Sequence, residues 1–312
     1  SRLLFLRGTA YQITGDHVSA AEDVLTLIRL QSHLRQEPSL INQLLSTAIL
    51  DFGIQLISNG LREHSWSDDQ LILFEKELAN VHLAETTLKA FRMERAIFTL
   101  TMRQLVDDGE REEKLKQMDI PFVLRKSSAT FRAWQYDNIR KFSEIIQAEC
   151  LSDEKGRPVH TEFPDEVVFI DATREFSGST LQRLRYLMVA IALPAYDTFI
   201  NRAKRAQFYA DSARIGIAME RFFLKNGSYP GTLSSDELAS FLSTPIPLDP
   251  FSGEPLKFQL TANNHFHFYS IGPNRKDESG LHRRDIEEGD WIWTLKLPGD
   301  FDREAYFERS RQ

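Results

Sequence analysis

The feature that most constrains this chain is a long amphipathic helix followed by a strand-rich segment, together covering residues 199–293. From Phe199, apolar residues recur at alternating spacings of four and three, which predicts one buried helical face. The members of this stripe are Phe199, Ala203, Ala206, Ala210, Ala213, Ile217 and Leu224, with Glu220 as its one break. Small residues in its first half let a neighbouring element approach closely. Gly227, after Asn226, ends the helix because glycine readily adopts a positive φ.

A short helix and three strands are predicted after this long helix. The short helix runs from Asp236 to Leu242, with Ser234 or Ser235 as its cap. The predicted strands are 256–260, 265–271 and 291–297, the first two forming a hairpin with its turn at 262–264. Alternation places His265 and His267 on one strand face, where they would offer two nitrogen ligands to a transition metal. A solvated strand face is the alternative, because no third ligand is positioned by sequence.

The N-terminal residues 1–150 carry helical periodicity with short polar breaks. The pattern predicts helices at about 3–13, 18–35, 40–61 and 131–149, and one that starts at Ser67 and could reach Val106. Ser67 and Gln70 have the spacing of a capping box. The order Ala10-Tyr11, Thr14-Gly15-Asp16 and Ala20-Ala21 is similar to a tetratricopeptide hairpin, but no sustained period of about 34 residues follows. An irregular hairpin array and a true repeat solenoid both remain open.

A connector, residues 151–180, separates the N-terminal helices from the long one. It contains prolines, glycines and four acids that could pair as general acid and base: Glu162, Asp165, Glu166 and Asp171. The alternative is a polar loop around a short strand-like run at 167–170. No nucleophile elbow, HExxH or Walker motif occurs in the chain, so we expect no catalytic residues and no enzyme.

Composition limits the partners and the location. The net charge of -7 and the isoelectric point near 5.7 argue against nucleic acid, whose binding surfaces are basic. The single cysteine, Cys150, excludes an internal disulfide. The longest uncharged apolar run, 186–196, is short of the roughly 20 residues that cross a bilayer. We therefore expect membrane attachment only through a segment before Ser1, such as a removed anchor or signal.

Five stretches resemble the type IV pilins and the major pseudopilins of type II secretion. They are LMVAIALPAYDTFINRAKRAQ from Leu187, ARIGIAMERFFLKNGSYPGTL from Ala213, LDPFSGEPLKF from Leu248, FYSIGPN from Phe268 and DIEEGDW from Asp285. They cover about 187–293 in the family's order. The resemblance implies a pseudopilin-like globular module, internal here and without a free apolar N-terminus for filament assembly. The whole arrangement also resembles secreted or membrane-anchored proteins of planctomycete and verrucomicrobial type, a resemblance that carries no known activity.

The same resemblance implies a calcium site in the loop 272–290, where the major pseudopilins bind Ca2+. By position, Asn274 and Asp285 stand at two of the family's aspartates, and Asp277 is the nearest substitute for a missing acid. Oxygen ligands of this kind suit calcium. Basic residues in the same loop favour the alternative of an ion-free loop, fixed by salt bridges and by packing of Trp291.

Together these patterns predict an α+β chain. We expect a tetratricopeptide-like irregular helical domain at 1–150, a connector at 151–180 and a pseudopilin-like module at 181–312, in which the long helix packs on a small antiparallel sheet. The expected function is a non-enzymatic, extracytoplasmic structural or interaction protein related to secretion, with a protein partner bound by the helical domain. Alternatives are a helical scaffold with the module as a stabilising lid, and a hydrolase using carboxylates between the domains.

Overall fold

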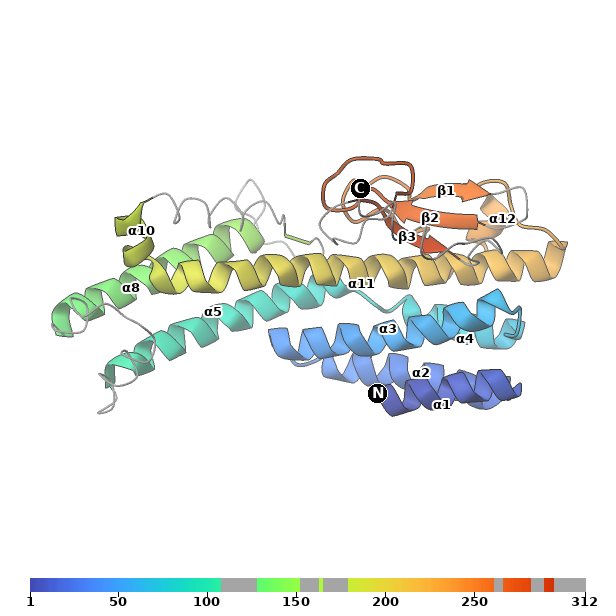
Figure 1. Cartoon of the computed structure of the whole chain (residues 1–312), viewed down its shortest axis with the longest axis horizontal. Coiled ribbons are helices and arrows are strands. Elements are labelled where there is room, and N and C mark those ends of the chain that lie inside the picture. The colour runs from blue at the N-terminus through green and yellow to red at the C-terminus, as the bar shows by residue number, and fades with distance from the viewer. Residues whose placement is uncertain (108–127, 152–162, 165–178, 261–265, 282–288, 295–312) are drawn as a thin grey trace. The chain divides into compact units, whose positions relative to one another are not determined.

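The computed structural model describes residues 1–107, 128–151, 163–164, 179–260, 266–281 and 289–294 (Figure 1). These residues are mostly helical and include a small three-stranded antiparallel sheet, which confirms the α+β class. Contacts group the chain into two compact units, one of residues 1–36, 44–83 and 202–312, the other of 37–43 and 84–201. These units are not consecutive along the chain, unlike the domains expected from the sequence, because the first joins the N-terminal helices to the C-terminal module.

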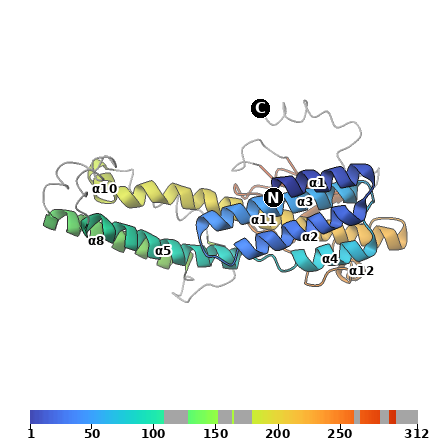
Figure 2. The same cartoon turned by 90° about the horizontal axis from the view of Figure 1, so that it is seen from below.

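The first unit contains a layer of four neighbouring helices (Figure 2). They are α1 (Arg2–Thr14), α2 (His17–Leu34), α3 (Leu40–Arg62, most of which belongs to this unit) and α4 (Asp68–Leu78). Gly15 ends α1 at φ 80°, as predicted, and Asp16 caps α2 by accepting from the Ser19 N–H. The predicted capping box of Ser67 and Gln70 is present at the start of α4.

Helix α3 ends at Arg62, one residue from its predicted end. Gly60, in its last turns, packs against the Trp66 indole, since a Cβ on it would lie 2.2 Å from that ring. The helix that starts at Ser67 does not reach Val106. It ends at Leu78, and a separate helix, α5, covers Leu83–Asp107.

A side chain from a distant helix closes the break between α4 and α5. Gln207 accepts from the backbone N–H of Leu83 at 2.9 Å and donates to the carbonyl of Val81 at 3.0 Å. It thereby satisfies backbone groups that helix ends leave without partners.

Helix α3 has the length and apolar composition of a membrane-crossing helix, and it is the one described helix that does. In its most apolar window 44% is buried inside the protein, so this finding is weak evidence for a membrane span.

The module of the first unit places a sheet against the C-terminal part of α11 (Leu187–Asn226). The strands are β1 (Lys257–Leu260), β2 (Phe266–Ser270) and β3 (Trp291–Thr294), in the order β1-β2-β3 and antiparallel. Phe268 pairs with Phe258 on one side and Trp293 on the other. The sheet lies on one side of α11, and α3 and α4 lie on the other (Figure 1). The short helix α12 (Asp236–Ala239) is capped by Ser235; the expected hairpin turn and residues 295–297 lie outside the described residues.

Gly216, just outside the predicted stripe of α11, lets the sheet approach this helix closely. Ala210, Ala213 and Ile217 are fully buried. Beside them, a Cβ added to Gly216 would lie 2.4 Å from the Trp293 ring. The predicted stripe is wrong at Leu224, which is exposed because Phe222 and Phe223 make the aromatic contacts of the last turns.

The second unit is built from α5, α8 (Ser128–Ile145), a π-helical turn η1 (Ile146–Cys150), α10 (Thr180–Arg185) and the N-terminal part of α11. Its core centres on Met102, Phe131 and Trp134. Phe142 stacks on Phe98 with ring centroids 4.1 Å apart. These contacts confirm a helix in the region predicted at 131–149, with most of its predicted apolar face buried.

We predict that Gly216→Val destabilises the first unit by about 2 kcal/mol, because the new side chain would overlap the rigid Trp293 ring and overpack the helix–sheet interface. Urea unfolding followed by tryptophan fluorescence would measure the change. Gly231→Val is the control, since nothing lies within 4 Å of a Cβ at that exposed position. Equal stabilities of the two variants would contradict the close approach.

Candidate functional site

The turn after residue 247 is tied to the end of β2 by one buried carboxylate. Asp249 Oδ1 accepts from the Phe251 N–H at 2.9 Å and from the Ser270 hydroxyl at 2.8 Å, and Oδ2 accepts from the Ile271 N–H at 3.0 Å. Two of the stretches that carry the family resemblance, LDPFSGEPLKF and FYSIGPN, therefore meet at Asp249.

A second buried carboxylate organises the loop that follows β2. Asp290 accepts from the Gly280 N–H at 2.7 Å and from the Glu278 N–H at 3.2 Å. The pKa of Asp290 lies above its ordinary value, mainly because the carboxylate is buried. The two N–H donors lower this pKa, and the charges of Glu278 and Asp277 raise it. At the base of the loop, Gly272 has φ 66°, and a Cβ there would lie 2.3 Å from the Gly289 carbonyl oxygen. Only glycine fits this crossing of the two loop ends.

Of the three predicted calcium ligands, Asn274 and Asp277 lie in the described part of this loop, and Asp285 lies outside the described residues. Asn274 accepts from the Lys276 N–H at 3.0 Å and donates to Glu278. Asp277 accepts from the Ser279 N–H at 3.0 Å and from the Tyr269 hydroxyl at 3.3 Å. These oxygens are engaged by protein donors, and in the described part of the chain no three His, Cys, Asp or Glu side chains are grouped to hold a metal.

The strand face with the predicted histidines is partly covered by the same loop. Tyr269 is 5% exposed, and a Cβ on Gly280 would contact both His267 and Tyr269 at about 3.5 Å. Burial lowers the pKa of His267. This face is therefore only partly solvated, with Tyr269 buried and His267 half-buried, and His265 lies outside the described residues.

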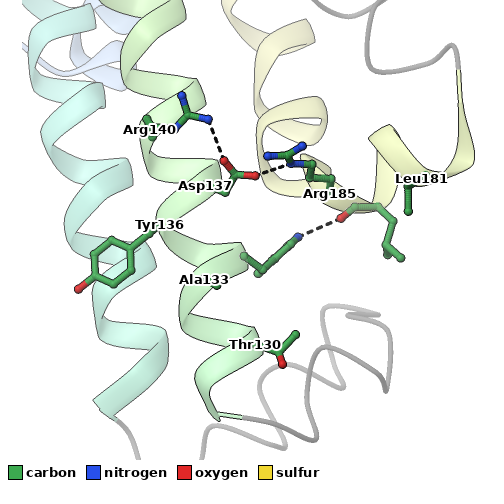
Figure 3. A pocket seen from close by; sticks show the side chains of 9 residues that line it. Thr130, Ala133, Tyr136, Asp137, Arg140, Leu181 and Arg185 are labelled. Carbon is green, nitrogen blue, oxygen red and sulfur yellow. Dashed lines mark hydrogen bonds and ion pairs between the residues drawn. The ribbon is translucent and has the colours of Figure 1, made fainter.

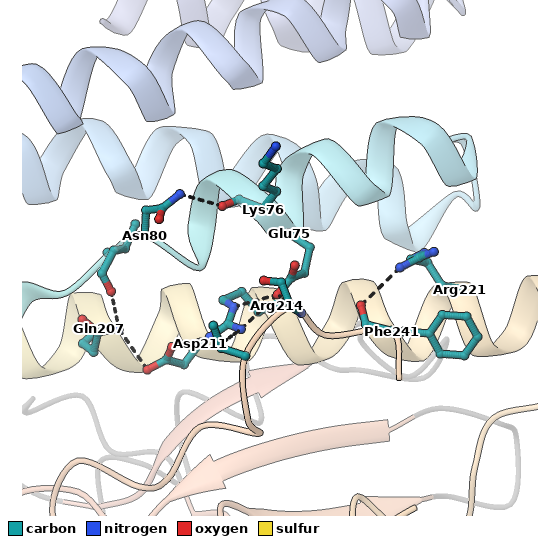
Figure 4. Close-up of polar contacts among 11 residues, drawn as sticks. Glu75, Lys76, Asn80, Gln207, Asp211, Arg214, Arg221 and Phe241 are labelled. Carbon is teal, nitrogen blue, oxygen red and sulfur yellow. Dashed lines mark hydrogen bonds and ion pairs between the residues drawn. The ribbon is translucent and has the colours of Figure 1, made fainter. Parts of the chain in front are cut away.

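A buried ion pair joins α11 to α4 and to the chain that enters the sheet (Figure 4). Glu75 Oε1 accepts from Arg214 Nη2 at 2.9 Å and Nε at 3.2 Å, and also from the Ser243 N–H at 3.2 Å. Arg214 further donates to the Thr244 hydroxyl. Both charged side chains are almost fully buried, at 5% and 6% exposed. Because each charged group in this cluster has a partner, we interpret the cluster as a structural contact between these elements.

Glu220, the break in the apolar stripe, is explained by a second polar contact across the first unit. Its buried carboxylate lies 2.8 Å from His64 Nδ1 and 3.4 Å from the Tyr229 hydroxyl. Phe223 stacks on both rings. Sequence analysis missed this group of three, although a carboxylate at a stripe position is itself a signal that a polar partner will be found in the fold.

The second unit carries a hollow of about 690 Å³ between α8 and α10 (Figure 3). Trp134 and Asn138 donate to the last carbonyls of α10, those of Leu184 and Arg185. Asp137 accepts from Arg185 at 2.5 Å and from Arg140 at 3.0 Å. These two hydrogen bonds hold the pKa of Asp137 below its ordinary value. The charges at this hollow thus neutralise one another, and its remaining lining is mostly apolar.

The four acids proposed as a hydrolytic set in the connector lie outside the described residues. Comparison of the chain with protein-family models, with curated proteins and with solved structures finds no match.

We predict that Asp211→Asn stabilises the protein in a pH-dependent way. Burial raises the pKa of Asp211 to about 6, against the lowering effects of Gln207 and Arg214. The folded state therefore binds this proton more tightly than the unfolded chain, and stability declines as pH rises from about 4 to about 6. The amide keeps an acceptor for Gln207 and removes the charge, so we expect a gain of about 2 kcal/mol near pH 8 and almost none near pH 4.

Urea unfolding of the variant and the parent chain at both pH values would measure this difference. Asp69→Asn is the matched control, because Asp69 is an exposed carboxylate in the first turn of α4. A gain of equal size at both pH values would contradict the assignment.

Proposed function

We propose that this chain is a non-enzymatic interaction protein of the cell envelope, with a pseudopilin-like C-terminal module held by a tetratricopeptide-like irregular helical layer. Its partner is a protein, bound by the helical part, and its location is extracytoplasmic. The observation that carries the proposal is an exposed apolar stripe on α1.

This stripe consists of Leu3, Leu6 and Ile13, which are 81%, 53% and 81% exposed. Their spacing of three and seven residues places them on one face of the helix. The opposite side of α1 packs in the unit, with Gly8 buried and Gln12 donating to the Leu56 carbonyl at 2.8 Å. Apolar side chains gathered on an exposed face are typical of protein contact surfaces.

The arrangement of the module supports its likeness to a pseudopilin. A long helix packs on a small antiparallel sheet, and the Asp249 turn fastens to the end of β2, where the family-like stretches meet. The face of α11 opposite the sheet contacts the helical layer through Arg214 and Arg221, which pair with Glu75 and Asp68. We therefore infer that the module packs against the helical layer of its own chain and does not act as a filament subunit.

For the loop 272–290 we propose the ion-free alternative, in which Asp290 and the packing of Trp291 hold the loop. Trp291 is fully buried and lies edge-on to Phe251 with centroids 4.8 Å apart. We predict the same thermal midpoint in chelator and in millimolar calcium, because a ligand raises the midpoint only by binding the folded state. A rise in calcium that disappears in the Asp277→Ala, Asp285→Ala double variant would overturn this and support the pseudopilin-type ion site.

We predict that a photo-crosslinking amino acid at Leu6 or Ile13 captures one discrete protein in cells that produce the full-length protein. The same amino acid at Glu22, exposed on α2, is the positional control. Leu3→Ser, which reduces the apolar stripe without touching the crosslinker, should lower the yield at least several-fold. Equal yields at all three positions, or a yield that Leu3→Ser leaves unchanged, would contradict a partner site on α1.

A further inference from the structure

A second hollow, of about 340 Å³, lies between α3 and α11 within the first unit. Its apolar lining includes Leu50 and Ile54, which are buried, and Ala206, which is half-buried. Pockets that hold small molecules begin at about this volume and combine an apolar lining with a few polar groups.

The polar groups at this hollow carry a net positive charge. Arg205 lies over the Tyr209 ring, 5.5 Å from its centroid, with Nη2 3.5 Å from the phenol oxygen. Arg202 is exposed and forms no ion pair within the part of the chain that the structure describes. Asp51, the acid at the hollow, accepts from Gln55 at 2.7 Å and pairs with neither arginine. Two cationic groups are therefore available beside an apolar lining.

This arrangement differs from that of the larger hollow in the second unit. There, Asp137 forms ion pairs with both arginines that line the space. At the α3–α11 hollow, the acid is bonded to an amide, so the guanidinium donors are not used by an internal carboxylate. Arginine binds carboxylates with paired N–H donors, and stacking on Tyr209 orders one of the two guanidinium groups before any ligand arrives.

We propose that the hollow between α3 and α11 binds a small amphipathic carboxylate, with its apolar body against Leu50, Ile54 and Ala206 and its carboxylate at Arg202 and Arg205. A carboxylate suits the guanidinium groups, and an apolar body suits the lining better than a fully polar anion does, because burying apolar surface is favourable. The site is independent of the partner surface on α1.

Isothermal titration calorimetry of the full chain tests the site, with decanoate below its micelle concentration as the probe. Decanoate binds the parent chain with a stoichiometry near one. The Arg202→Gln, Arg205→Gln double variant binds it at least about tenfold more weakly, since hydrogen bonds to charged groups contribute about this much each. The matched control, Lys89→Gln with Lys225→Gln, removes the same charge from exposed surface pairs elsewhere and leaves the affinity unchanged.

Three further probes separate the two halves of the proposal. Decanol lacks the charge, decyltrimethylammonium reverses it, and inorganic phosphate lacks the apolar body; each binds at least about tenfold more weakly than decanoate. Ala48→Leu adds bulk at the wall of the hollow and weakens the binding of decanoate. The thermal midpoint of this variant confirms that it is folded.

No saturable decanoate binding, or binding that both arginine substitutions leave unchanged, overturns the proposal. Equal binding of decanol reduces the site to an apolar hollow, and equal binding of phosphate reduces it to a charged patch; either result also overturns it.

Discussion

The buried ion pair of Glu75 and Arg214 is the interaction on which the arrangement of the first unit depends. One carboxylate oxygen receives two guanidinium nitrogens from α11 and one backbone N–H from the chain that leads to the sheet. Removing two charges from water costs several kcal/mol each, and that cost is offset only when geometry and additional hydrogen bonds are good. The pair therefore fixes one position of α4, α11 and residue 243 relative to one another.

The two sides of α11 make different kinds of contact, and this difference explains which residues occur on each side. Toward α3 and α4 the helix makes several polar contacts, from Gln207 at the α4–α5 break to Glu220 beside His64. Toward the sheet its contacts are apolar and close, with Gly216 against Trp293. We propose that recognition takes place at the stripe on α1 and at the hollow between α3 and α11.

Local signals in the sequence predicted much of the fold. The cap at Ser67 and the stop at Gly15 each depend on neighbouring residues, so they could be predicted without a structure. The break between α4 and α5 could not, because Gln207 stands 124 residues from the backbone N–H that it satisfies.

The candidate sites were less predictable than the fold. Asn274 and Asp277 were identified by position in a family motif, but their hydrogen bonds are made within the loop itself. Asp290, which organises that loop, was only one acid among several in the sequence. Glu220 signalled a buried partner, yet nothing in the sequence named His64, because the two come together only when α11 packs beside the turn after α3. The hollow between α3 and α11 likewise depends on residues about 150 positions apart.

A double-mutant cycle on Glu75 and Arg214 tests the central claim most directly. Glu75→Leu, Arg214→Met and the double variant would be compared by urea unfolding, with the exposed pair Glu85 and Lys89 as a control cycle. Each single change should cost about 3–5 kcal/mol, because it leaves one buried charge without its partner, and the double change should cost far less than the sum. Costs that add to within about 0.5 kcal/mol, like those of the control pair, would contradict the account.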